Sequence, residues 1–235
     1  MKKILLILMW SVISAAFIGP GTVTTAASAG TQTGFKLLWT LLFSIIACFV
    51  LQEASARVTI ASGLSLGAAI RCRFRSGIKG VFVLLLVVGA VVLGCAAYEA
   101  GNILGSVAGA SLQISIAPWI LTFSIGIFAF LLLFTGSVKT VARILGFIVA
   151  VMGCLFFATA CMYKFSVQEV IRGIFIPSFP EDSTLLILGL VGTTVVPYNL
   201  FLGSSIAEGQ KKQEMRLGLG IAMFIGGMIS MAVLI

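Results

Sequence analysis

Long runs of apolar residues, separated by short polar stretches, dominate this sequence. A helix that crosses a hydrocarbon core of roughly 30 Å needs about 20 mostly apolar residues. Runs of that length cover approximately residues 4–30, 37–60, 80–104, 117–135, 141–163, 184–207 and 217–235. The pattern predicts an all-α integral membrane protein, with residues 1–235 forming one transmembrane domain. Because the last run stops at residue 235 inside an apolar stretch, we expect the sequence to be a piece of a longer protein.

Glycine and proline interrupt two of these runs. Ile18-Gly19-Pro20-Gly21-Thr22 lies in the first run, and Val195-Val196-Pro197-Tyr198-Asn199 lies in the run over 184–207. An unpaired backbone group costs several kcal/mol in hydrocarbon, so a helix break at membrane depth is tolerated where it is buried in protein or lines a cavity. A lone proline usually only kinks a membrane helix, whereas a matched pair of breaks is typical of transporters built from inverted repeats. We therefore predict a substrate site where the two breaks meet.

The composition supports the membrane prediction and narrows the chemistry. Hydrophobic residues make up 60% of the chain and charged residues 9%, whereas about a quarter of the residues of a soluble domain are charged. The net charge of +8 comes from basic residues dispersed through the loops, so no nucleic-acid partner is expected. The sequence has no histidine. Its cysteines form no CxxC pair, so we expect the cysteines to be packing residues rather than metal or redox centres.

The basic residues predict the orientation in the membrane. Under the positive-inside rule, a cytoplasmic N-terminus places most of them in the cytoplasm. These are Lys2, Lys3, Arg57, Arg71, Arg73, Arg75, Lys79, Lys139, Arg143, Lys211, Lys212 and Arg216, against Lys36, Lys164 and Arg172 outside. We expect a bacterial-type inner (plasma) membrane protein. The longest external loop, around 164–183, contains Pro177 and Pro180 and is expected to be irregular.

Two acidic residues lie within apolar runs, where carboxyl groups are functional candidates. Arg57 follows Glu53 by one helical turn, and the pattern predicts an i,i+4 ion pair. Glu99 has no basic residue within two turns. This leaves open a role in proton or ion coupling, a protonated structural carboxyl bonded to a neighbouring helix, or a carboxyl hydrated near the external end of the span.

At the two breaks the sequence resembles the NRAMP family of proton-coupled divalent-metal transporters. The likeness lies in Gly19-Pro20-Gly21-Thr22, in Ala29-Gly30-Thr31-Gln32-Thr33-Gly34-Phe35-Lys36-Leu37-Leu38-Trp39, and in Val196-Pro197-Tyr198-Asn199-Leu200-Phe201-Leu202. It implies a LeuT-type inverted-repeat fold with broken first and sixth helices, of which this chain holds the first repeat and the start of the second. It also implies a transporter rather than an enzyme.

The metal-ligand positions of the family are altered in this chain. The resemblance places the family's Asp, Asn and Met ligands at Gly19, Thr22 and Val196, and its carbonyl ligand at Thr193. Tyr198 replaces the family histidine, and Glu99 falls where the family has a third-helix glutamate connected with proton movement. Neutral hydroxyls and carbonyls offset little of the dehydration cost of a transition-metal ion.

We therefore expect a secondary transporter of a metal or other inorganic cation that works by alternating access, with an unusual substrate. The expected substrate-site residues are Gly19, Thr22, Thr193, Val196, Tyr198 and Asn199, and Glu99 is the candidate for coupling. A carrier of a small polar organic solute and a truncated, inactive membrane protein are the alternatives. The expected partners are the lipid bilayer, the ion or solute, and the remainder of the second repeat or a second chain. No cofactor is expected beyond a co-transported proton or cation.

Overall fold

The computed structural model describes Trp10 and residues 18–134, 138–162 and 165–235 of the chain. In these residues every regular element is a helix, which agrees with the predicted all-α class. The elements are α2 (Pro20–Thr33), the 3-10 helix η1 (Gly34–Leu37), α3 (Leu38–Ser62), α4 (Leu66–Arg73), α5 (Gly77–Ser111), α6 (Pro118–Phe134), α7 (Val138–Met162), α8 (Val167–Phe175), α9 (Thr184–Thr194), α10 (Pro197–Ile206) and α11 (Lys212–Leu234).

By length and hydropathy, four described stretches are able to cross a membrane. They are Pro20–Ser62, Gly77–Ser111, Thr184–Ile206 and Lys212–Leu234. Pro118–Phe134 and Phe147–Met162 are apolar but shorter. The start of the first predicted run, before residue 18, lies outside the described residues apart from Trp10.

Several boundaries differ from those expected from hydropathy. α5 extends beyond 80–104 at both ends, because the small residues at its end continue the helix without a proline. α11 begins at Lys212 rather than near 217, since a charged first turn is compatible with a helix. The run over 184–207 is two helices, separated at Val195 and Val196.

The loop expected to be irregular contains the helix α8. Val167, Val170, Ile171 and Ile174 recur at helical spacing, and both prolines come after the helix has ended. The short helix α4 was also absent from the prediction. Its first turn is capped by Ser65, whose hydroxyl accepts a hydrogen bond of 3.4 Å from the Ala68 N–H.

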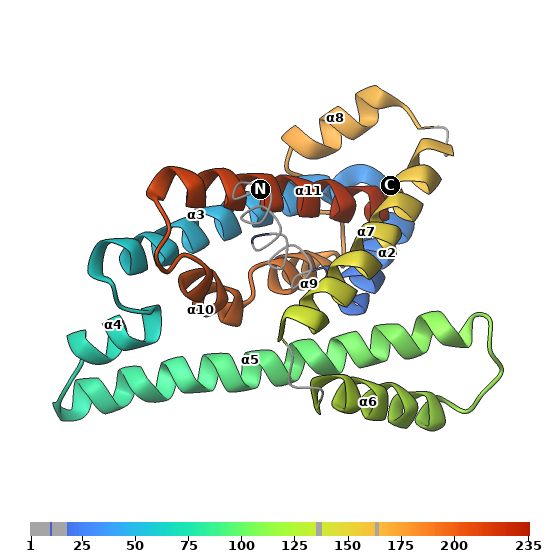
Figure 1. Cartoon of the computed structure of the whole chain (residues 1–235). Helices are drawn as coiled ribbons and strands as arrows, with labels where there is room; N and C mark the ends of the chain where they lie inside the picture. The colour runs from blue at the N-terminus through green and yellow to red at the C-terminus, as the bar shows by residue number, and fades with distance from the viewer. Residues whose placement is uncertain (1–9, 11–17, 135–137, 163–164) are drawn as a thin grey trace.

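Two buried clusters hold the helices together. Trp10, Ile18 and Cys48 join residues of α11, including Met215 and Leu219, in the first cluster. The second cluster joins α2, α3, α9 and the end of α11, and its members are Ala26, Ala29, Leu37, Leu38, Leu41, Leu190 and Leu234. α3 and α11 lie together on one side of α9 and α10, and the long helix α5 runs along the other side with α6 beside it (Figure 1). The α9–α10 junction therefore lies between α3 and α5.

Candidate functional site

The first break is the start of α2. Gly19 is extended, with φ −115° and ψ 173°, and Pro20 occupies the first helical position. A residue before proline is pushed out of the helical region, and the fixed φ of proline suits the first turn of a helix. The Gly19 carbonyl accepts the first helical hydrogen bond, from the Val23 N–H at 3.0 Å. The sequence Gly-Pro therefore sets where α2 begins.

The second break has the same local design. α9 ends at Thr194, and Val196 is extended with φ −94° and ψ 129° before Pro197 opens α10. The Asn199 N–H donates to the Val196 carbonyl at 3.1 Å. The interruption predicted at 195–199 is thus present, and it resembles the first break in backbone conformation.

One face of α5 touches both breaks. Four residues at helical spacing make the contacts: Gly94, Tyr98, Asn102 and Gly105. The ring of Tyr98 meets the ring of Tyr198 edge to face, with 5.8 Å between the centroids. The Tyr98 hydroxyl lies 3.4 Å from the Thr22 hydroxyl. α5 therefore connects the predicted residues Thr22 and Tyr198 of the two breaks.

Glycine allows α5 to come this close. A Cβ at Gly105 would lie 2.6 Å from the Pro20 carbonyl oxygen and 3.0 Å from the Gly21 nitrogen. At the other break, a Cβ at Gly94 would be in ordinary contact with the Pro197 ring at 3.7 Å. The backbone of α2 thus packs directly on α5 at the first break.

Asn102 occupies the space beside Gly19. Its Oδ1 accepts a hydrogen bond of 3.2 Å from the Gly21 N–H, so the amide caps the start of α2. A Cβ added at Gly19 would overlap this oxygen and lie 3.1 Å from the Asn102 Cγ. Sequence reasoning did not identify Asn102, although an amide four residues after Tyr98 in an apolar helix was an available signal.

α3 lines the other side of the second break. The Cys48 thiol donates to the Thr194 carbonyl at 3.5 Å, and the Ser55 hydroxyl donates to the Leu200 carbonyl at 2.7 Å. Between them on the same face, Gln52 donates from Nε2 to the Cys48 sulfur at 3.2 Å. The bond from Cys48 satisfies the Thr194 carbonyl, which the end of α9 leaves without a helical partner.

Asn199 is the most unusual side chain of the site. It is fully buried, and neither its Oδ1 nor its Nδ2 has a hydrogen-bond partner. Gln52 is also fully buried, and its Oε1 has no partner. A buried polar atom left unpaired costs about 1–3 kcal/mol. In native proteins such an atom calls for a physical explanation, such as local strain, a functional role, or a bound water or ion.

A hollow of about 360 Å³ opens between α2, α5 and α9 beside these contacts. Its polar lining includes Thr24, Thr25, Tyr98 and Thr193, and among the described residues no charged side chain lines it. Thr193, predicted from the sequence, therefore lies on the wall of a cavity that also contains Gly21 of the first break.

Val196 and Glu99 are the remaining residues predicted from the sequence, and only Val196 is buried. Val196 is buried, with 3% of its surface exposed, and provides the extended residue before Pro197. Glu99 is exposed, one position from the α5 face that meets the breaks. Its Oε2 accepts a hydrogen bond of 3.4 Å from Asn102 Nδ2, so it contacts the site through Asn102.

The ion pair predicted within α3 is confirmed and extended. Arg57 Nη2 lies 3.3 Å from Glu53 Oε2, and Arg216 of α11 donates to Glu53 Oε1 at 2.7 Å. The carboxylate is 7% exposed. This network ties α3 to α11 away from the breaks. Sequence spacing revealed Arg57 but not Arg216, which is distant along the chain.

The donors at the breaks are neutral. Over the described part of the chain, no three His, Cys, Asp or Glu side chains gather where a metal ion would fit. What the two breaks present instead is hydroxyl groups, a buried carboxamide and backbone carbonyls. Such a set suits a partly hydrated cation or a polar solute better than a dehydrated transition-metal ion.

Comparison with known sequences places these features in context. The family model described as natural resistance-associated macrophage protein-like matches residues 11–235. The divalent metal cation transporter MntH of Bacillus subtilis (strain 168) is 30% identical over 239 residues, which cover 95% of this chain and 55% of that protein. Natural resistance-associated macrophage protein 2 of Mus musculus is 27% identical over 216 residues, or 87% of this chain and 37% of that protein.

Comparison with solved structures supports the fold. A manganese transporter of Eremococcus coleocola superposes with a TM-score of 0.75 at 17% identity, covering 97% of this chain and 50% of that chain. The expected fold class is thereby confirmed. The chain spans about half, or less, of the length of the relatives it matches.

Proposed function

Because the chain belongs to the natural resistance-associated macrophage protein-like family, we propose that it forms the substrate-binding half of a secondary transporter that moves an inorganic cation across the membrane by alternating access. Two of the proteins named above are described as a divalent metal cation transporter and a manganese transporter. An integral membrane location follows from the family and from the long apolar helices.

The observation that carries this proposal is the buried, unpartnered amide of Asn199 at the start of α10. An amide oxygen held without a partner is a pre-formed cation ligand, and an unwound helix supplies carbonyl oxygens next to it. The Thr22 and Thr193 hydroxyls add further neutral oxygen donors on the first break and on the wall of the hollow. This set would hold a cation that keeps part of its water shell.

Glu99 is the group we assign to coupling. It lies outside the hollow but is bonded to Asn102, which in turn caps the start of α2. Loss or gain of a proton at Glu99 would change the acceptor of the hydrogen bond from Asn102 Nδ2. The change would then reach the first break through the Asn102 side chain. In the Glu99→Gln variant the pH dependence of uptake should flatten. Uptake with an unchanged pH profile would contradict this role.

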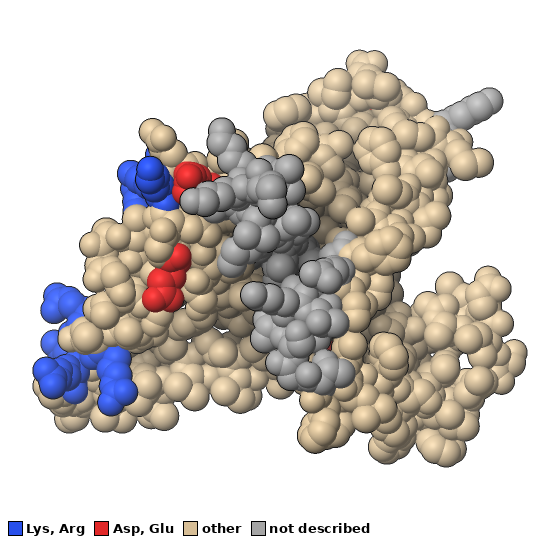
Figure 2. All heavy atoms as spheres, in the orientation of Figure 1, with Lys and Arg blue, Asp and Glu red and all other residues tan. Residues whose placement is uncertain are grey.

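We propose a cytoplasmic N-terminus and a bacterial-type inner membrane, and the charge distribution supports a cytoplasmic location for the end of the molecule that contains α4. Figure 2 shows basic side chains gathered at one end of the molecule, over α4 and the neighbouring ends of the other helices. Arg71, Arg73, Arg75 and Lys79 belong to this end. The positive-inside rule assigns such an end to the cytoplasm.

The site would be completed by segments beyond those described. The support is that the chain spans 37% and 55% of the length of two relatives named above. The missing partner is either the remainder of a second repeat on a longer chain or a second chain.

Uptake into proteoliposomes tests the proposal. The full-length protein containing this chain would be reconstituted and offered Mn²⁺, Fe²⁺, Mg²⁺, Na⁺ and, separately, neutral amino acids. We expect cation uptake that is lost in Asn199→Leu and kept in Gln113→Leu, since Gln113 is an exposed amide outside the site. Uptake of an amino acid without any cation would overturn the cation assignment, and no uptake of any solute would overturn the transport proposal.

A further inference from the structure

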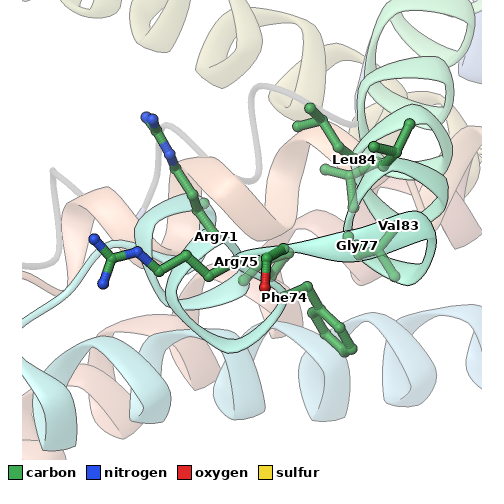
Figure 3. A pocket seen from close by; sticks show the side chains of 12 residues that line it. Arg71, Phe74, Arg75, Gly77, Val83 and Leu84 are labelled. Carbon is green, nitrogen blue, oxygen red and sulfur yellow. The ribbon is translucent and has the colours of Figure 1, made fainter.

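A second hollow, of about 560 Å³, lies between α4 and the start of α5, away from the two breaks. Figure 3 shows it from close by, with Arg71 and Arg75 extending to one side and Leu84 on the other. The hollow therefore has a basic end and an apolar end.

Two glycines shape the turn beside this hollow. Gly77 has φ +80°, a left-handed conformation that lets the chain turn sharply between α4 and α5. A Cβ at Gly80 would lie 2.7 Å from the Phe74 carbonyl oxygen, so glycine is needed for the turn to rest on α5.

The basic end carries unpaired positive charge. Arg71 and Arg75 line the hollow, and the exposed residues Arg73 and Lys79 lie next to it in the sequence. Both salt bridges found among the described residues involve Glu53, so none of these four cations has a carboxylate within 4.0 Å there. The positive end of the α5 macrodipole points to the same place. An anion is the ligand that this end fits.

The apolar end belongs to a membrane-spanning helix. Val81, Val83, Leu84 and Val87 of α5 line it, and Val81 and Leu84 are each 59% exposed. α5 is apolar enough to cross a bilayer, so this wall faces lipid chains. A hollow of 300–1,000 Å³ is the usual size of a small-molecule site.

We infer that this hollow binds one anionic phospholipid from the leaflet that contains α4. The phosphate lies at the Arg71 and Arg75 guanidinium groups, and the upper part of an acyl chain lies along the apolar wall of α5. Basic pockets beside membrane helices at the cytoplasmic surface bind anionic lipid headgroups in this way. The inference depends on membrane insertion but not on which substrate the protein carries.

Native mass spectrometry of the purified full-length protein containing this chain, in neutral detergent, tests the inference. The probes are dioleoylphosphatidylglycerol, dioleoylphosphatidylcholine and inorganic phosphate. We expect one phosphatidylglycerol to bind tightly, and the double variant Arg71→Gln, Arg75→Gln to weaken it about 30-fold, since a basic residue near a membrane surface contributes about 1 kcal/mol. The charge-matched variant Arg73→Gln, Lys79→Gln should lose about threefold or less, because screening over ~8 Å weakens charges that do not touch the headgroup.

The apolar wall has its own pair of variants. Val83→Trp fills the hollow and should abolish the bound lipid without any change of charge, whereas Leu85→Trp, on the same helix but outside the hollow, should leave it bound. Equal losses in the two charge variants would show that binding is surface attraction without a site, and would overturn the inference. Equal affinity for phosphatidylcholine, or displacement of the lipid by millimolar phosphate, would overturn it as well.

Discussion

A side chain at position 19 and the amide of Asn102 compete for the same space, and this gives the sharpest prediction. Gly19 is extended, a conformation that any residue adopts, so Gly19→Ala adds a methyl group without backbone strain. That methyl group would overlap Asn102 Oδ1 and lie 3.1 Å from Cγ and 3.4 Å from Nδ2. Asn102 must therefore leave its place at the start of α2.

The expected cost combines two effects. The clashing atoms are the far end of the Asn102 side chain, which can rotate away at little cost, so the steric effect is small. Loss of the hydrogen bond from the Gly21 N–H costs about 1 kcal/mol, and Gly19→Ala should thus destabilise the protein by about 1 kcal/mol. At about 2–4 °C per kcal/mol for a chain of this size, the midpoint of thermal unfolding in detergent should fall by about 2–4 °C.

A double-mutant cycle with Asn102→Ala checks the cause. Asn102→Ala removes all three clashing atoms, so Gly19→Ala should cost less than about 0.5 kcal/mol in that background. The reasoning is refuted if Gly19→Ala is harmless on its own, or if it costs as much with alanine at 102 as with asparagine.

The same contact bears on restoring metal ligands. The triple variant Gly19→Asp, Thr22→Asn, Val196→Met should bind Mn²⁺ weakly, because the new side chain at position 19 must first displace the Asn102 amide from the start of α2. Addition of Asn102→Ala should raise Mn²⁺ affinity in isothermal titration calorimetry of the full-length protein. Equal affinity with and without the fourth change would contradict the blocking role.

Three further outcomes follow from buried contacts. Glu53→Gln should destabilise the protein by about 1–3 kcal/mol, a range kept low because both arginine partners are half exposed to solvent. The control Glu208→Gln, at an exposed site, should have no effect in the same thermal assay. Asn199→Leu removes unpaired buried atoms, so it should leave thermal stability unchanged or raise it by about 1–2 kcal/mol, while it abolishes uptake. A large loss of stability would show that the Asn199 amide has a partner. Gly105→Ala should lower both thermal stability and uptake, because the added methyl group pushes α2 away from α5. The control Gly109→Ala meets no atom within 4 Å and should change neither quantity. Equal effects of the two substitutions would rule out the close contact between Gly105 and the start of α2.

The two breaks were predictable because their cause is local. Proline at 20 and 197 fixes its own backbone and that of the residue before it, so the start of each helix is encoded within a few residues. The pair Glu53–Arg57 was predictable for the same reason, since its spacing is one helical turn.

What the sequence did not reveal depends on packing between distant segments. Asn102 reaches Gly19 and Gly21 only because α5 crosses the start of α2, and Arg216 reaches Glu53 only because α11 packs on α3. The helix α8 is a different case. Its apolar residues have helical spacing, but the prolines that follow it gave the more prominent signal of an irregular loop.

The neutral lining of the hollow between α2, α5 and α9 has an electrical consequence. In a carrier with acidic ligands, the negative charge of the ligands moves through the membrane field when the empty carrier returns to its starting state. Among the described residues, the wall of this hollow has no charged side chain. A cation crossing there carries its full charge through the membrane field, which changes the energy by about 2.3 kcal/mol per elementary charge per 100 mV. The loaded step should therefore respond to voltage by about 50-fold per charge over 100 mV, and the empty return step should be insensitive to it.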